Sequence, residues 1–140
     1  MKNEIYTFIG AFGSFIASFF GGWDSALATL VVFMIADYVT GFMVAGVFHN
    51  SDKTESGTLE SRAGWKGICR KAGTLIIILV AYFLESLIGT SYIRDAVCIA
   101  FIVNETISII ENAGLMGIPI PSILIKSIDV LKNRGDDKNE

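Results

Sequence analysis

Four acidic side chains lie inside long apolar stretches of the chain, where a charged group is costly. They are Asp37, Glu85, Glu105 and Glu111. A membrane-spanning helix needs ~20 mostly apolar residues, and a carboxylate near its middle costs roughly 2.5–3.5 kcal/mol on insertion scales. No lysine or arginine falls within the same stretches. The sequence therefore predicts that these carboxylates face another helix, another copy of the chain, or water.

The other side chains form no catalytic or metal-binding motif. The sequence has no HExxH, no GxSxG, no phosphate-binding loop and no Cys/His cluster. Two acid–amide pairs, Asn104-Glu105 and Glu111-Asn112, have no nucleophile or metal ligand beside them. The two cysteines lack the spacing of a disulfide or metal site. We therefore expect no enzymatic activity, no cofactor and no bound metal.

Composition indicates a small membrane protein. The chain has 140 residues, of which 52% are hydrophobic, and its mean hydropathy is +0.57. Only 18% are charged, against about 25% in soluble domains. We predict an all-α protein with a single membrane domain over residues 1–134. The expected parts are transmembrane helices at 5–23, 26–48, 72–93 and 96–118, a basic loop at 49–71, an amphipathic helix at 122–134 and a charged tail at 135–140.

Small residues recur at helical spacing along the first predicted span. Because small side chains let helix backbones approach closely, such a face is typical of helix association in lipid. The predicted packing partner lies either in the same chain or in another copy. The residues assigned to helix packing are Gly10, Ser14, Ser18 and Gly22, their neighbours Gly13, Ala17 and Gly21, and Gly41 of the second span.

The fourth predicted span is too polar to face lipid on all sides. Its apolar residues contribute roughly −3 to −6 kcal/mol to insertion, whereas its two glutamates cost ~5–7 kcal/mol. Its polar side chains occupy adjoining faces of a helix. We predict that they line a pore or a polar helix interface, together with Asp37 and Glu85. The fourth-span members of this set are Asn104, Glu105, Ser108, Glu111 and Asn112.

The basic residues predict the topology. In a four-helix layout, Arg94 falls on one side of the membrane and the other ten of the 11 basic residues fall on the opposite side. The positive-inside rule then places both termini and the 49–71 loop in the cytoplasm. Within the loop, basic residues predict either a helix on the membrane surface or a positive flank that fixes topology. These are Arg62, Lys66, Arg70 and Lys71.

Three segments resemble a known family. Residues 104–112 (NETISIIEN) followed by 117–121 (GIPIP) resemble the C-terminal signature of a bacteriophage holin family that includes the clostridial toxin-secretion holins. Residues 37–41 (DYVTG) and the basic segment 64–71 resemble the same family in the same order.

This resemblance implies a small, non-enzymatic protein of the bacterial cytoplasmic membrane. Such proteins oligomerise and open pores that release an endolysin for host cell lysis, or a large toxin. The implied partners are further copies of the chain, the lipid bilayer and the released cargo, and no nucleic acid is involved.

Two other functions also fit the residues. A small proton-coupled multi-pass exporter would use a membrane carboxylate to couple protons to substrate, and would show substrate-specific counterflow across a tight bilayer. A partner subunit without transport activity would co-purify with an unrelated membrane protein at fixed stoichiometry. A holin, by contrast, would pass unrelated solutes and collapse the membrane potential.

Overall fold

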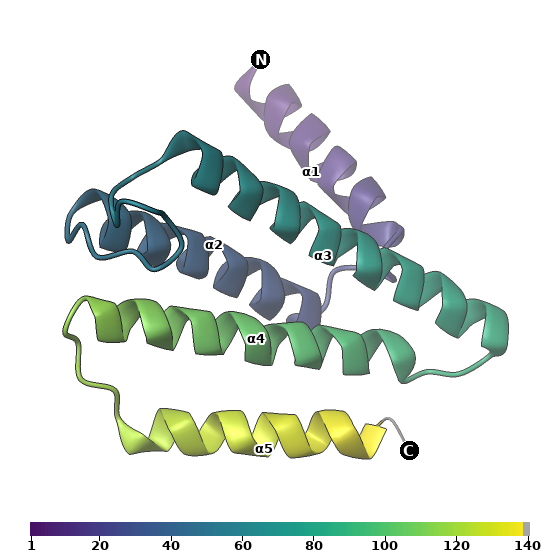
Figure 1. The fold of residues 1–140 in the computed structure, drawn as a ribbon. Helices are drawn as coiled ribbons and strands as arrows, with labels where there is room; N and C mark the ends of the chain where they lie inside the picture. The colour runs from purple at the N-terminus through teal and green to yellow at the C-terminus, as the bar shows by residue number, and fades with distance from the viewer. Residues whose placement is uncertain (139–140) are drawn as a thin grey trace.

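The computed structural model describes the backbone of residues 1–138 and the side chains of residues 1–134. Within these residues the chain forms five α-helices and no strand (Figure 1), so the all-α prediction is confirmed. The helices are α1 (Lys2–Ser18), α2 (Ser25–Gly46), α3 (Ser61–Ile88), α4 (Ile93–Leu115) and α5 (Ser122–Lys138).

The largest difference from the predicted bounds is at α3. This helix begins at Ser61, inside the predicted 49–71 loop, rather than at residue 72. Two glycines in its first turns are poor helix formers, but both pack on α2. A Cβ on Gly64 would lie 3.2 Å from Tyr38 Oη, and one on Gly67 would lie 3.7 Å from Tyr38 Cε2. The second half of the predicted basic loop is therefore helical and packs on α2; a helix over these basic residues was one of the two alternatives that the sequence left open.

The C-terminal helix is also longer than predicted. The backbone remains helical through the start of the expected tail at residue 135 and as far as Lys138. The last part of that tail, residues 139–140, lies outside the described residues.

Helix α4 is central to the packing. It contacts α2, α3 and α5, and α5 runs alongside it on the side away from α3 (Figure 1). A buried apolar cluster joins α2, α3 and α4, and Leu131 of α5 packs against it. The cluster consists of Leu30, Met34, Ile78, Cys98 and Ile102. It holds the three helices that carry the polar side chains described below.

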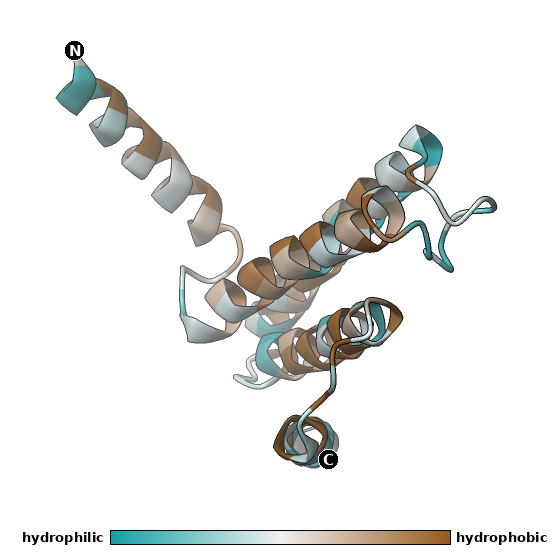
Figure 2. Ribbon diagram, turned by 90° about the vertical axis from the view of Figure 1, so that its left-hand side faces the viewer, coloured by the Kyte–Doolittle hydropathy of each residue, from teal (hydrophilic) through white to brown (hydrophobic). Residues whose placement is uncertain are grey.

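Helix α1 stands apart from the other four (Figure 2). Near its end Ala17 is buried, but Phe8, Phe12 and Phe15 are exposed. A Cβ added to Gly10 would meet no atom within 4 Å. Among the described residues, the part of the predicted packing face at Gly10 and Gly13 therefore has no partner helix, whereas its far end approaches the bundle at Ala17 and Gly21. Its pairing with another copy stays a prediction.

Among the described residues, two helices are long and apolar enough to cross a membrane, namely α2 and α3. Only 28% of the most apolar stretch of α2 and 11% of that of α3 are buried inside the structure. Soluble proteins rarely expose apolar surface on this scale, and Figure 2 shows hydrophobic residues along both helices. The prediction of membrane helices is thus supported for two of the four expected spans. Helix α1 has 17 residues, which corresponds to about 25 Å.

The turn between α1 and α2 depends on glycine. Gly21 and Gly22 have φ of +88° and +94°, a backbone conformation that residues with a Cβ adopt at a cost. Asp24 then caps α2, because its Oδ1 accepts a hydrogen bond of 3.0 Å from Leu27 N.

We expect Gly21→Ala to destabilise the protein more than Gly22→Ala does. Both changes force alanine into a left-handed conformation, at roughly 1 kcal/mol or more. Only at Gly21 would the new Cβ also lie 2.8 Å from Tyr82 Cε2, whereas nothing lies within 4 Å at Gly22. Unfolding free energies measured by SDS titration in mixed micelles provide the comparison. Equal losses for the two variants would show that the Tyr82 contact is unimportant.

Candidate functional site: a buried polar cluster between α2, α3 and α4

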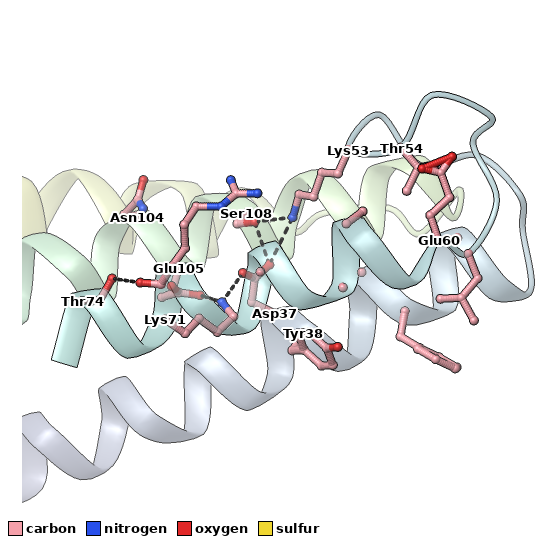
Figure 3. Close-up of a pocket in the computed structure, with 18 residues that line it drawn as sticks. Asp37, Tyr38, Lys53, Thr54, Glu60, Lys71, Thr74, Asn104, Glu105 and Ser108 are labelled. Atoms are coloured by element: carbon pink, nitrogen blue, oxygen red, sulfur yellow. Dashed lines mark hydrogen bonds and ion pairs between the residues drawn. The ribbon is translucent and has the colours of Figure 1, made fainter. Parts of the chain in front are cut away.

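Polar side chains from three helices converge inside the bundle (Figure 3). Helix α4 contributes Glu105, Ser108 and Asn112, which share one face because they are spaced three and four residues apart. Asp37 of α2 faces them, and Lys71 of α3 extends between the two helices. We call these five residues the polar cluster.

Lys71 bridges two carboxylates. Its Nζ lies 2.7 Å from Asp37 Oδ2 and 2.8 Å from Glu105 Oε2. Both acidic residues are 7% exposed. The basic partner of both carboxylates thus comes from another helix, although no lysine or arginine lies within the predicted spans that hold them. Lys71 precedes the predicted span by one residue, and its long stem carries the ammonium group inward.

The second oxygen of Asp37 is also fully engaged. Its Oδ1 accepts hydrogen bonds from Ser108 Oγ at 2.6 Å and from Asn112 Nδ2 at 3.1 Å. Lys53, from the loop before α3, donates to Ser108 Oγ at 3.1 Å and lies 3.7 Å from Asp37 Oδ1. Asn112 Nδ2 also reaches Thr40 Oγ1 at 2.9 Å. Asp37 is thus the centre of the network.

The charges of this network balance. Asp37 and Glu105 face the two ammonium groups of Lys53 and Lys71. Burying ions costs free energy even when they are paired, but removing one partner costs more because an uncompensated charge remains. The arrangement therefore favours one relative position of α2, α3 and α4 and penalises their partial separation.

The structure divides the predicted polar residues into two groups. Asp37, Glu105, Ser108 and Asn112 belong to the polar cluster; Asn104, Glu111 and Glu85 do not. Asn104 is exposed beside the cluster, Glu111 is exposed further along α4, and Glu85 is half-buried in the last turns of α3.

Sequence reasoning missed the inward roles of Lys53 and Lys71. The sequence predicts either a membrane-surface helix or a topology-fixing flank for Lys71, and places Lys53 only among the basic residues on the cytoplasmic side. One signal was available for Lys71: a lysine immediately before an apolar run can extend its stem alongside that run. Nothing in the local sequence indicates that Lys53 reaches Ser108.

A groove opens beside the polar cluster. It has a volume of about 330 Å³ and is bounded by α2, the loop before α3, the first turns of α3, and α4 (Figure 3). Gly41 lies where α2 approaches α4, since a Cβ there would be 3.7 Å from Asn112 Nδ2. Among the described residues, no group of three or more His, Cys, Asp or Glu side chains is placed to hold a metal ion.

A second ionic contact lies at the other end of α4. Arg94 is 5% exposed and places Nη1 2.6 Å from Asp24 Oδ2 and Nη2 3.2 Å from the Gly22 carbonyl oxygen. Its Nε also donates to the Phe20 carbonyl. Arg94 therefore ties the α1–α2 turn to the start of α4.

The pKa of Asp24 reflects this contact. Partial burial acts to raise it, but the hydrogen bond and charge of Arg94, together with the N–H of Leu27, outweigh that effect. As a result, the pKa lies below its ordinary value of 3.8.

Comparison with known proteins gives a consistent result. The model of the bacteriophage holin family matches residues 14–133. A 14.9 kDa protein in the nagH 3′ region of Clostridium perfringens is 37% identical over 134 residues, covering 94% of this chain and 96% of that relative. A Listeria innocua protein is 34% identical over 140 residues, covering 98% and 94% of the two chains.

A more distant relative has a functional name. The probable holin of Bacillus phage phi105 is 28% identical over 115 residues, covering 81% of this chain and 79% of that protein. No solved structure matches the chain. The matched family consists of non-enzymatic membrane proteins, so the expectation that the protein is not an enzyme is confirmed. The family model covers most of the chain, and the resemblance seen in the sequence is thereby confirmed: this protein belongs to the bacteriophage holin family.

Proposed function

We propose that this protein oligomerises in the bacterial cytoplasmic membrane and forms pores through which an endolysin or a large toxin leaves the cell. Family membership supports the proposal, as does similarity to a probable holin. The observation that carries it is the polar cluster, in which charged and uncharged polar side chains are enclosed between helices that expose many large apolar side chains.

The single copy is suited to lipid. The carboxylates of Asp37 and Glu105 are balanced by the ammonium groups of Lys71 and Lys53, while large apolar side chains of α2 and α3 point outward. Exposed examples are Val32, Ile35, Phe42, Ile76, Ile77 and Phe83. A protomer of this kind diffuses in the bilayer without exposing its charges to hydrocarbon. Such exposure would cost free energy, which is why charged groups are rare within membranes.

In the assembled state, the side chains of the polar cluster become exposed to water. When α2, α3 and α4 separate, their inner faces prefer water to lipid because ionised and amide groups are then hydrated. Several copies arranged around a common lumen would supply that water. The unpaired α1 provides a surface for contact between copies, through the small residues Gly10, Gly13 and Ser14.

In this proposal α1 and α4 join α2 and α3 as membrane spans, and both termini are cytoplasmic. Helix α5 packs along α4 in the single copy, with Ile128 buried. If α4 spans the bilayer, α5 cannot stay beside it at depth, because Lys126, Lys132 and Arg134 would enter hydrocarbon. Insertion of α4 is therefore coupled to release of α5 onto the membrane surface, where an amphipathic helix is stable.

Inducible expression in a bacterial host tests the function. We expect growth to continue during a lag and then to stop abruptly, with collapse of the membrane potential and release of unrelated cytoplasmic reporters. The physical reason is that pores require a threshold concentration of copies. Potential-sensitive dye fluorescence and reporter activity in the medium are the measurements.

The same experiment separates the alternatives. An exporter, whose coupling site would be the carboxylates bridged by Lys71, leaves the bilayer tight and gives counterflow of one class of substrate. A partner subunit gives neither effect and co-purifies with another membrane protein. Continued growth with an intact potential at high membrane levels of the protein would contradict the holin proposal.

A further inference from the structure

Three basic side chains on the first turns of α3 have no counter-charge. Arg62, Lys66 and Arg70 recur at every fourth position and so occupy one strip of the helix surface. All three are exposed, and none of the three side chains forms a hydrogen bond or ion pair with any described residue. The adjacent Lys71 is different, because its charge is balanced by Asp37 and Glu105. We call Arg62, Lys66 and Arg70 the basic strip.

The basic strip lies at the depth of lipid headgroups when α3 spans the bilayer. From Arg70 to Ile88 the helix rises about 27 Å, close to the ~30 Å thickness of the hydrocarbon core. Lys66 and Arg62 then lie about 6 and 12 Å further out. Trp65, which is 67% exposed on the same turns, is a residue type enriched at this boundary.

A groove opens beside the inner end of the basic strip. Its volume of about 330 Å³ falls in the range of small-ligand sites. Arg70 supplies a cationic group without a counter-charge to its lining, whereas the charge of Lys53 is directed to Asp37. Phe42 and Leu59, 52% and 51% exposed, supply apolar surface. The acidic residue at this end, Glu60, accepts hydrogen bonds from Ser56 rather than from Arg70.

We propose that the basic strip and the groove bind the phosphate headgroup of an anionic phospholipid, such as phosphatidylglycerol. Arginine matches phosphate with paired N–H donors, and basic pockets between membrane helices are a recognised way to hold anionic headgroups. The site requires α3 to lie in a membrane but does not depend on pore formation.

Quenching of Trp65 fluorescence by brominated lipid tests the site. A Trp23→Phe background leaves Trp65 as the single tryptophan of the 2 in the chain. The full-length protein is reconstituted in vesicles containing brominated phosphatidylglycerol or brominated phosphatidylcholine. We expect stronger quenching by the anionic lipid. Arg70→Ala should lower that preference by about fivefold, the equivalent of ~1 kcal/mol per basic residue near the surface.

Matched variants make the result specific. Arg70→Lys should be intermediate, because lysine keeps the charge but not the paired N–H donors, and alanine at all three positions of the basic strip should abolish the preference. Lys126→Ala on α5 removes the same charge from another exposed site and should leave the preference unchanged. Adding inorganic phosphate at constant ionic strength shows whether the phosphate group alone occupies the site.

Two outcomes would overturn the proposal. The first is equal quenching by the two lipids with the Trp23→Phe protein. The second is a lipid preference that survives loss of the whole basic strip, or that falls equally in Lys126→Ala, which would assign it to net charge alone. Circular dichroism of each reconstituted variant confirms that the helices are present.

Discussion

Lys71→Met is expected to open the bundle and to shorten the lag before lysis. The change leaves Asp37 and Glu105, both 7% exposed, facing each other without the ammonium group that bridges them at 2.7 and 2.8 Å. Removing one partner of a buried ion pair costs about 3–5 kcal/mol. The closed single copy should lose that much stability, so that separation of the helices begins at a lower concentration of protein.

Two controls isolate the cause. Lys66→Met removes the same charge from an exposed position of α3 without a partner, and should leave both stability and lysis time near wild type. The triple variant Lys71→Met, Asp37→Asn, Glu105→Gln removes the bridged charges together and should recover much of the loss, because no buried unpaired ion remains and Lys53, the ammonium group that loses its partner, is 42% exposed to water. Unfolding in mixed micelles and the onset of reporter release are measured at matched membrane levels. If Lys71→Met behaves like Lys66→Met in both assays, the polar cluster does not hold the closed state.

Arg94→Met is expected to free the α1–α2 turn and to destabilise the protein by about 3 kcal/mol. Arg94 donates to Asp24 and to the carbonyl groups of Phe20 and Gly22, and methionine leaves all three without that donor. Because Asp24 is 49% exposed, most of the loss comes from the carbonyl groups rather than from the ion pair. Arg94→Lys should be intermediate, since a single ammonium cannot reproduce the planar fork.

Spin labels on α1 and α2 provide the structural readout for Arg94→Met. Their distance distribution should broaden in this variant and should stay narrow in Arg62→Met, which removes an exposed arginine without a partner. An unchanged distribution would show that α1 is positioned independently of Arg94.

The contact between Arg94 and Asp24 makes the stability of the protein depend on pH, in a direction that can be stated. The pKa of Asp24 is lowered in the folded protein from its ordinary value of 3.8. Its contribution to stability is therefore fully present above that value and is lost as the pH falls through the lower folded pKa. The Asp24→Asn variant should lack this contribution to stability. The difference in unfolding free energy between the wild type and the variant should therefore shrink below about pH 4.

Helix α3 begins earlier in the chain than hydropathy indicates. Hydropathy marks the apolar run after Lys71, and the local sequence before it contains Gly64 and Gly67, which suggest a loop. In the structure both glycines lie against Tyr38 of α2, and the helix continues through them. That extension places Lys71 inside α3 and the basic strip on its outer surface.

The sequence by itself determined the class of the protein. Long apolar runs, low charge and the clustering of basic residues indicated a small helical membrane protein, because hydropathy and charge are properties of each segment alone. It also showed that Asp37 and Glu105 need a polar environment. These conclusions required no knowledge of which helices meet.

Only the tertiary structure decided which groups meet. Glu105 and Glu111 lie on one helix with similar local sequence, yet the first is buried against Lys71 and the second is exposed. Arg94, which the sequence presented only as a lone basic residue, is buried against the α1–α2 turn. The reason is physical: a helix presents side chains in every direction, and the packing of α2, α3 and α5 around α4 determines which direction becomes the interior.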